Sequence, residues 1–233
     1  MSSDARAATP HSSTAAWRLR VGRQRALMAL FDLGRRKGFG LRAARLYAFG
    51  VFVWYAVALW LARGSEPEVS QGLLHAALVS LSWVVGALGA LGTAQISANQ
   101  SERAGLEALA AQRGFSERDM LRARFLVSSG RVAKLIGVPA LCLVGVAVAC
   151  GLPAMWALVT APAVALYAVL LGLGLAFLAQ FSAELAPRHP RALLAALVLG
   201  PVLLSRAYPA IPSLPDALSM LLDRLLRAGA ALT

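Results

Sequence analysis

The chain alternates between long runs of uncharged residues and shorter segments that carry charged residues. Residues 69–101 and 135–183 contain no Asp, Glu, Lys or Arg. A helix needs about 20 consecutive apolar residues to cross the hydrocarbon core of a bilayer, whereas a soluble domain has no use for longer uncharged runs. The pattern therefore predicts an all-α, polytopic membrane protein.

The same pattern predicts about five membrane-spanning helices. Four of them are expected at residues 46–62, 72–95, 135–150 and 155–179. The third and fourth are expected to form a hairpin through the turn 151–153, because the 49 uncharged residues around it would otherwise make one helix about 73 Å long. A fifth span begins at Ala192 but soon meets Pro201 and Arg206, so it is expected to be short or broken.

The residues before the first span divide into two segments. Residues 1–16 are small and polar, and they are expected to form a disordered tail. Residues 17–45 form a basic cytoplasmic segment in which Leu27, Leu30 and Phe31 share one helical face. This segment is expected either to lie on the membrane surface as an amphipathic helix or to be a solvated positive flank.

The C-terminal stretch has a different periodicity from the spans. Its leucines recur at helical spacing, at Leu218, Leu221, Leu222, Leu225 and Leu226. Asp223 and Arg224 lie on the opposite side of the same helix, which is typical of an interfacial amphipathic helix and not of a sixth span. Residues 46–233 are therefore expected to form a single transmembrane domain.

Cations are distributed unevenly between the two sides of this predicted topology. Of the 23 Lys and Arg residues, nineteen lie on the side of the N-terminus and of the loop 96–134, and four lie on the other side. Because cytoplasmic loops of membrane proteins are enriched in cations, the N-terminus and this loop are expected to be cytoplasmic. The net charge of +12 is explained by this topology, and we expect no nucleic-acid partner.

The sequence contains no catalytic or metal-binding pattern. None of the three histidines, His11, His75 and His189, is spaced with Cys, Asp or Glu as in a metal site. Neither lysine, Lys37 or Lys134, precedes the Ser or Thr of a phosphate-binding loop. The chain is therefore expected not to be an enzyme by itself and to use no cofactor or metal.

One cytoplasmic segment, residues 101–125, has more specific features. Its first half is helical in character, with an apolar stripe of Leu106, Leu109 and Ala110. Arg103 and Glu107 are spaced to form an ion pair on this helix. Such a helix, lying across the cytoplasmic ends of two spans, is suited to dock a soluble partner, although a solvated connector has the same pattern.

The second half of this segment predicts where the next helix begins. Gly114 is expected to end the first helix. Ser116 and Asp119 have the spacing of a capping box, which starts a second helix that leads into the third span.

The loop and the order of the spans resemble the permease subunits of ABC-2-type transporters. The matching positions of the loop, in family order, are Glu102, Gly105, Leu106, Glu107, Leu109 and Ser116. The family's Thr is missing here, and Arg113-Gly114 replaces its Pro. The basic N-terminus, the two spans before the loop, the tight hairpin and the broken fifth span also follow the family's order.

The resemblance implies a function and a set of partners. Two such subunits, identical or related, would enclose a path for export across a bacterial inner membrane, driven by separate cytoplasmic ATP-binding subunits. The implied docking residues are Glu102, Arg103, Gly105, Leu106, Glu107, Leu109 and Arg113. In this interpretation Glu107 belongs to the contact face, and Leu109 anchors the helix on its apolar side. The alternative hypothesis is a non-transporting membrane scaffold or assembly subunit that uses the same loop to recruit a partner.

Overall fold

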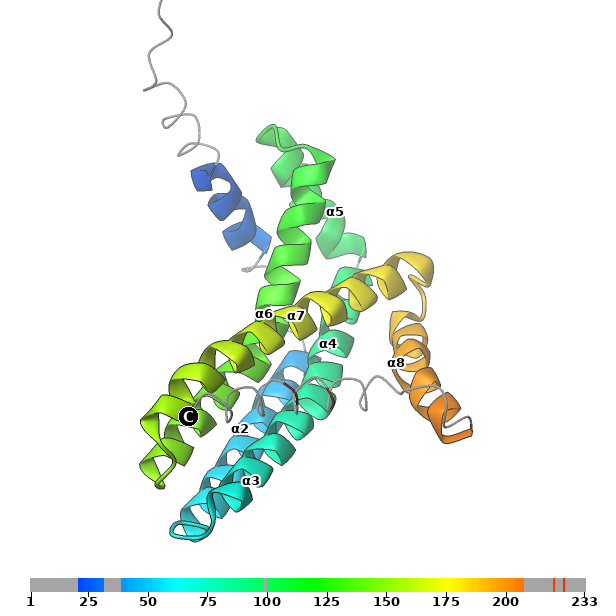
Figure 1. The fold of residues 1–233 in the computed structure, drawn as a ribbon. Coiled ribbons are helices and arrows are strands. Elements are labelled where there is room, and N and C mark those ends of the chain that lie inside the picture. The colour runs from blue at the N-terminus through cyan, green and yellow to red at the C-terminus, as the bar shows by residue number, and fades with distance from the viewer. Residues whose placement is uncertain (1–20, 32–38, 99, 208–219, 221–223, 225–233) are drawn as a thin grey trace, which may run out of the picture.

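The computed structural model describes residues 21–31, 39–98, 100–207, 220 and 224, and all the regular structure in these residues is helical (Figure 1). The disordered tail expected at 1–16 and the amphipathic helix expected around Leu218 lie outside the described residues. The described helices after residues 21–31 are α2 (Phe39–Leu61), α3 (Pro67–Ser80), α4 (Gly86–Ala98), α5 (Gln100–Gln112), α6 (Glu117–Ala149), α7 (Ala154–Leu185) and α8 (Pro190–Ala207).

Four of these stretches are long and apolar enough to cross a membrane, namely Leu41–Leu61, Pro67–Ala94, Glu117–Ala149 and Ala154–Leu185. The second stretch joins α3 to α4 through the π-helical segment η1 (Leu81–Val85). The expected fifth span corresponds to α8, which continues through Pro201, and its uncharged stretch at residues 192–205 is shorter than a span. The predicted all-helical architecture is confirmed for the described residues, with four stretches that could span a membrane, and the count of five spans is not confirmed.

The helices α6 and α7 are much longer than the apolar spans that their sequences predict. They contain 33 and 32 residues, so each is about 50 Å long, against a hydrocarbon core of about 30 Å. The predicted turn between them is confirmed, with Gly151 at a φ of 120°. The helix that was expected to start at Ser116 and lead into the third span is also confirmed, because α6 runs from Glu117 to Ala149 without a break.

The centre of the bundle is the packing of α6 against α7, which form the largest interhelical contact. Gly172 of α7 lies so close to α6 that an added Cβ would be 2.8 Å from the carbonyl oxygen of Ser129. Gly86 and Gly89 face side chains instead of backbone, with an added Cβ 2.9 Å from Leu175 and 3.3 Å from Leu135. The closest backbone approach therefore depends on Gly172.

Buried hydroxyl groups connect the second apolar stretch to α7. The Tyr167 hydroxyl donates a hydrogen bond of 2.9 Å to the Ser82 hydroxyl, which donates to the Leu78 carbonyl at 2.7 Å. Ser82 belongs to the π-helical segment η1, where the turn of the helix is wider than in an α-helix. Both residues are buried, so Ser82 provides the acceptor that the Tyr167 hydroxyl needs in an apolar surrounding.

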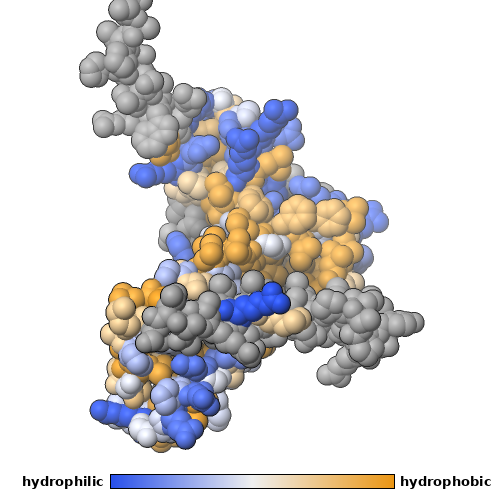
Figure 2. Space-filling model, viewed as in Figure 1, coloured by the Kyte–Doolittle hydropathy of each residue, from blue (hydrophilic) through white to orange (hydrophobic). Residues whose placement is uncertain are grey.

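The outer surface of the bundle is apolar where lipid would contact it. On α2 the side chains of Leu46, Phe49, Trp54 and Trp60 are all largely exposed. Figure 2 shows hydrophobic residues over the middle of the molecule and hydrophilic residues gathered near the α5–α6 end. This distribution is typical of a protein whose solvent is lipid in the middle and water at the ends.

We expect Gly172→Ala to weaken the α6–α7 contact, because the new methyl group would overlap the backbone of α6. The matched control is Gly174→Ala, since a Cβ at Gly174 meets nothing within 4 Å. Thermal unfolding in detergent should show a loss of stability of about 1–3 kcal/mol for Gly172→Ala only. Gly174→Ala should be neutral or slightly stabilising. Equal stability of the two variants would show that the contact is looser than described.

Candidate partner-docking site

Three helical segments pack together at one end of the bundle and form what we call the three-helix unit: residues 21–31, α5 and the first turns of α6. Its small core contains Leu27 and Phe31, each 1% exposed, with Ala110 and Ala123. The apolar face of residues 21–31, expected to lie on the membrane surface or in water, is thus buried against protein. The apolar face that the sequence identified contacts α5 and α6, and its position relative to the membrane surface stays a prediction.

Arg23 holds residues 21–31 against the turn between α5 and α6. Its guanidinium donates hydrogen bonds to the carbonyl oxygens of Arg113, at 3.1 Å, and Gly114, at 2.7 Å. The same group lies 4.9 Å from the centre of the Phe115 ring. These carbonyls follow the end of α5, where helical partners are lacking, so Arg23 acts as a cap from a distant segment.

The turn itself has the predicted geometry. Gly114 has a φ of 72°, which ends α5 in the left-handed region. The Ser116 side chain accepts a hydrogen bond from the Asp119 backbone at 3.2 Å, and the predicted capping box is present. The Ser116 hydroxyl also donates to the Asp119 carboxylate at 2.7 Å.

An ion pair connects α5 to α6 inside the three-helix unit. Arg124 Nη1 donates to Glu107 Oε1 at 3.0 Å, and the Arg124 side chain is only 2% exposed while Glu107 is 32% exposed. The sequence assigned Glu107 to the outer contact face, with Arg103 as its ion-pair partner. In the structure Glu107 links α5 to α6 through Arg124, and its place on the contact face of a partner stays a prediction.

The other predicted docking residues occupy three kinds of position. Leu106 belongs to the core of the unit, as expected. Leu109, expected to anchor α5 on its apolar side, is 47% exposed, so this expectation was wrong. Gly105 and Arg113 are exposed. The remaining two, Glu102 and Arg103, lie on α5, but their side chains are outside the described part of the structure.

The outward face of α5 carries no charge from Gly105 to Gln112, and the exposed Arg113 follows at its end. Gly105, Ala108, Leu109 and Gln112 follow helical spacing and are all exposed. A solvated helix face normally carries charged residues, and this face has only one amide and one large apolar side chain. Among the described residues, no three potential metal ligands come together.

Sequence reasoning missed three residues that organise the site, namely Arg23, Phe115 and Arg124. The signal for the first helix was present, because Leu27 and Phe31 repeat at a spacing of four residues. The signal for Arg124 was weak, since a single arginine among several at the start of α6 does not reveal which one is buried.

Comparison of this chain with protein-family models, with curated proteins and with solved structures gives no match.

We expect Arg124→Gln to loosen α5 from α6, because Glu107 would lose a charged partner in a partly dehydrated site. The matched control is Arg118→Gln, which removes an exposed arginine from the same helix. Hydrogen exchange of the α5 amides should accelerate by an amount corresponding to about 1–3 kcal/mol in Arg124→Gln and should not change in the control. Unchanged protection in both variants would mean that the ion pair contributes nothing to the unit.

Proposed function

We propose that this chain is the membrane-spanning permease subunit of an ABC transporter, and that it works as an exporter. Two copies, or one copy and a related permease, surround the path, and a separate cytoplasmic ATP-binding subunit docks on α5. The observation that carries the proposal is the exposed, nearly uncharged face of α5 around Leu109. Burial of such an apolar surface by a partner protein is favourable, because it removes the surface from water.

The connection of α5 to the membrane bundle also supports the proposal. A partner that moves α5 needs a stiff path to the spans, and α6 is one continuous helix from the three-helix unit to the far end of the bundle (Figure 1). The pair of Glu107 and Arg124 joins α5 to that helix directly. If the partner docked on a flexible connector, its movement would not be transmitted to the membrane-spanning helices.

A charge on the outward face of α5 provides the main test. Leu109→Asp should weaken the complex with a candidate ATP-binding subunit at least tenfold, because an aspartate would be desolvated in the interface. The fold should survive, since Leu109 is already 47% exposed. Leu121→Asp is the matched control, because Leu121 is an exposed leucine on α6. Complex formation and substrate-linked ATP turnover in proteoliposomes are the measurements.

The outcomes of this test separate three hypotheses. If Leu109→Asp lowers both complex formation and turnover while Leu121→Asp lowers neither, the permease proposal stands. If complex formation falls but ATP turnover never depends on this chain, the chain is a scaffold and not a transporter subunit. If neither quantity changes in Leu109→Asp, α5 is not the docking element, and the proposal is wrong.

The orientation of the chain can be tested independently. We expect a single cysteine at Gly105, an exposed position of α5, to be on the cytoplasmic side. In a background with Cys142 and Cys150 replaced by alanine, Gly105→Cys should react with an impermeant maleimide only after the membrane is permeabilised. A cysteine at Gly64, in the turn between α2 and α3, should react in intact cells. The reverse labelling pattern would contradict the proposed topology.

A further inference from the structure

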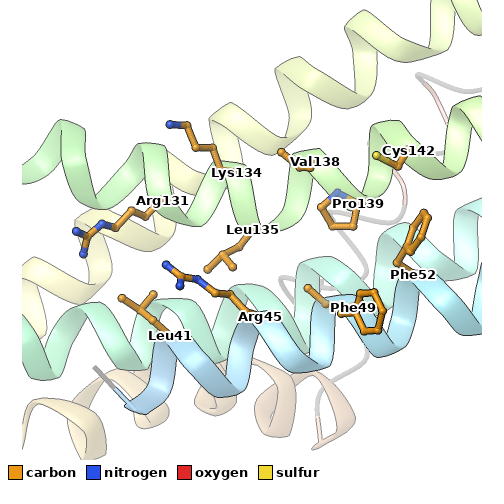
Figure 3. A pocket seen from close by; sticks show the side chains of 11 residues that line it. Leu41, Arg45, Phe49, Phe52, Arg131, Lys134, Leu135, Val138, Pro139 and Cys142 are labelled. Atoms are coloured by element: carbon orange, nitrogen blue, oxygen red, sulfur yellow. The ribbon is translucent and has the colours of Figure 1, made fainter. Parts of the chain in front are cut away.

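A groove lies between α2 and α6, on the outer surface of the bundle. It encloses about 430 Å³. Its walls come from Arg45, Phe49 and their neighbours on α2, and from the stretch 131–142 of α6. Figure 3 shows that these two helices run side by side along the groove, so that its two ends lie at different depths in the bundle.

The two ends of the groove have different chemistry. At the end nearer the three-helix unit lie three cations, Arg45, Arg131 and Lys134, and none of the described residues that line the groove is acidic. At the other end the lining is apolar, with Phe49, Val138 and their neighbours (Figure 3). A ligand that matches this lining has a negatively charged head and an apolar body.

The length of the groove fits one leaflet of a bilayer. On α2 the lining runs from Leu41 to Phe52, and on α6 it runs from Arg131 to Cys142. Each stretch rises about 16 Å at 1.5 Å per residue, which is close to half of a hydrocarbon core of about 30 Å. An acyl chain that starts at the cations would therefore follow the groove to about the middle of the membrane.

We infer that this groove is a binding site for an anionic phospholipid, whose phosphate lies among Arg45, Arg131 and Lys134 and whose acyl chain lies along Phe49 and Val138. Basic pockets between membrane helices are the usual sites for such headgroups. The apolar wall is open to the surroundings, because Phe49 and Val138 are more than half exposed. A second copy of this chain is a less suitable occupant, because a symmetric contact would bring the same cations together. The inference does not depend on the proposed transport function.

Native mass spectrometry of the full chain in detergent provides the test. Phosphatidylglycerol should bind in preference to phosphatidylcholine with the same acyl chains. Arg45→Gln with Lys134→Gln should reduce this preference by about fivefold for each cation removed. Arg42→Gln is the matched control, because Arg42 is an exposed arginine of α2 that does not line the groove. It should keep the preference.

A second arm tests the apolar half of the site without changing its charge. Val138→Trp should fill the groove and lower phosphatidylglycerol binding as strongly as the loss of the cations. In the unmodified chain Cys142, an exposed thiol at the apolar end, should react more slowly with a maleimide when phosphatidylglycerol is added, and phosphatidylcholine should have little effect. The thiol measurement uses the native sequence and does not depend on the folding of any variant.

Three results would overturn the inference. Unchanged lipid preference after removal of Arg45 and Lys134 would show that the cations are not the headgroup site. Unchanged binding in Val138→Trp, together with equal Cys142 reactivity in both lipids, would show that the anion is attracted to the surface and not held in the groove. Protection of Cys142 that rises with protein concentration and ignores lipid would show that a second copy covers this face.

Discussion

The continuity of α6 is the constraint on which the rest of this structure depends. In its apolar part this helix packs against α7, where Gly172 allows the two backbones to approach closely. Before that part it supplies Arg124 to the ion pair that fixes α5. It also forms one wall of the groove beside α2. One continuous helix therefore connects the three-helix unit, the contact with α7 and the groove.

The three-helix unit is held mainly by groups that satisfy helix ends and buried charge. Arg23 supplies donors for the carbonyls after α5, and Ser116 and Asp119 cap the start of α6. Its apolar core is small, so these polar contacts make up a large share of what orders the unit. The polar contacts at the turn between α5 and α6 therefore help to order all three segments of the unit.

Much of the fold follows from the sequence because the signals are local. Uncharged runs mark the spans, Gly114 ends one helix, and Ser116 with Asp119 begins the next. These features depend on neighbours within a few residues, so a single sequence contains them. The length of α8 was harder to predict, because its proline did not interrupt the helix.

The candidate site was predicted less well because its energetics are not local. Periodicity identified α5 as amphipathic, but Leu109 and Ala110 are adjacent in sequence, and only tertiary packing decides which of them is covered. Similarly, Glu107 is spaced to pair with Arg103, yet its observed partner is Arg124, seventeen positions away. The spacing of charges along α5 does not reveal the Arg124 contact, because Arg124 is brought to Glu107 only by the packing of α5 on α6.

The π-helical segment Leu81–Val85 determines which way the side chains of α4 point relative to those of α3. A π-helical turn holds one more residue than an α-helical turn, and one residue of an α-helix corresponds to a rotation of about 100°. Without the extra residue α4 would turn by that angle relative to α3. Gly86 would then point away from Leu175, while Ser82 would stay near Tyr167. The wide turn thus changes the direction in which later side chains point. One continuous stretch can therefore place Ser82 against Tyr167 and Gly86 against Leu175.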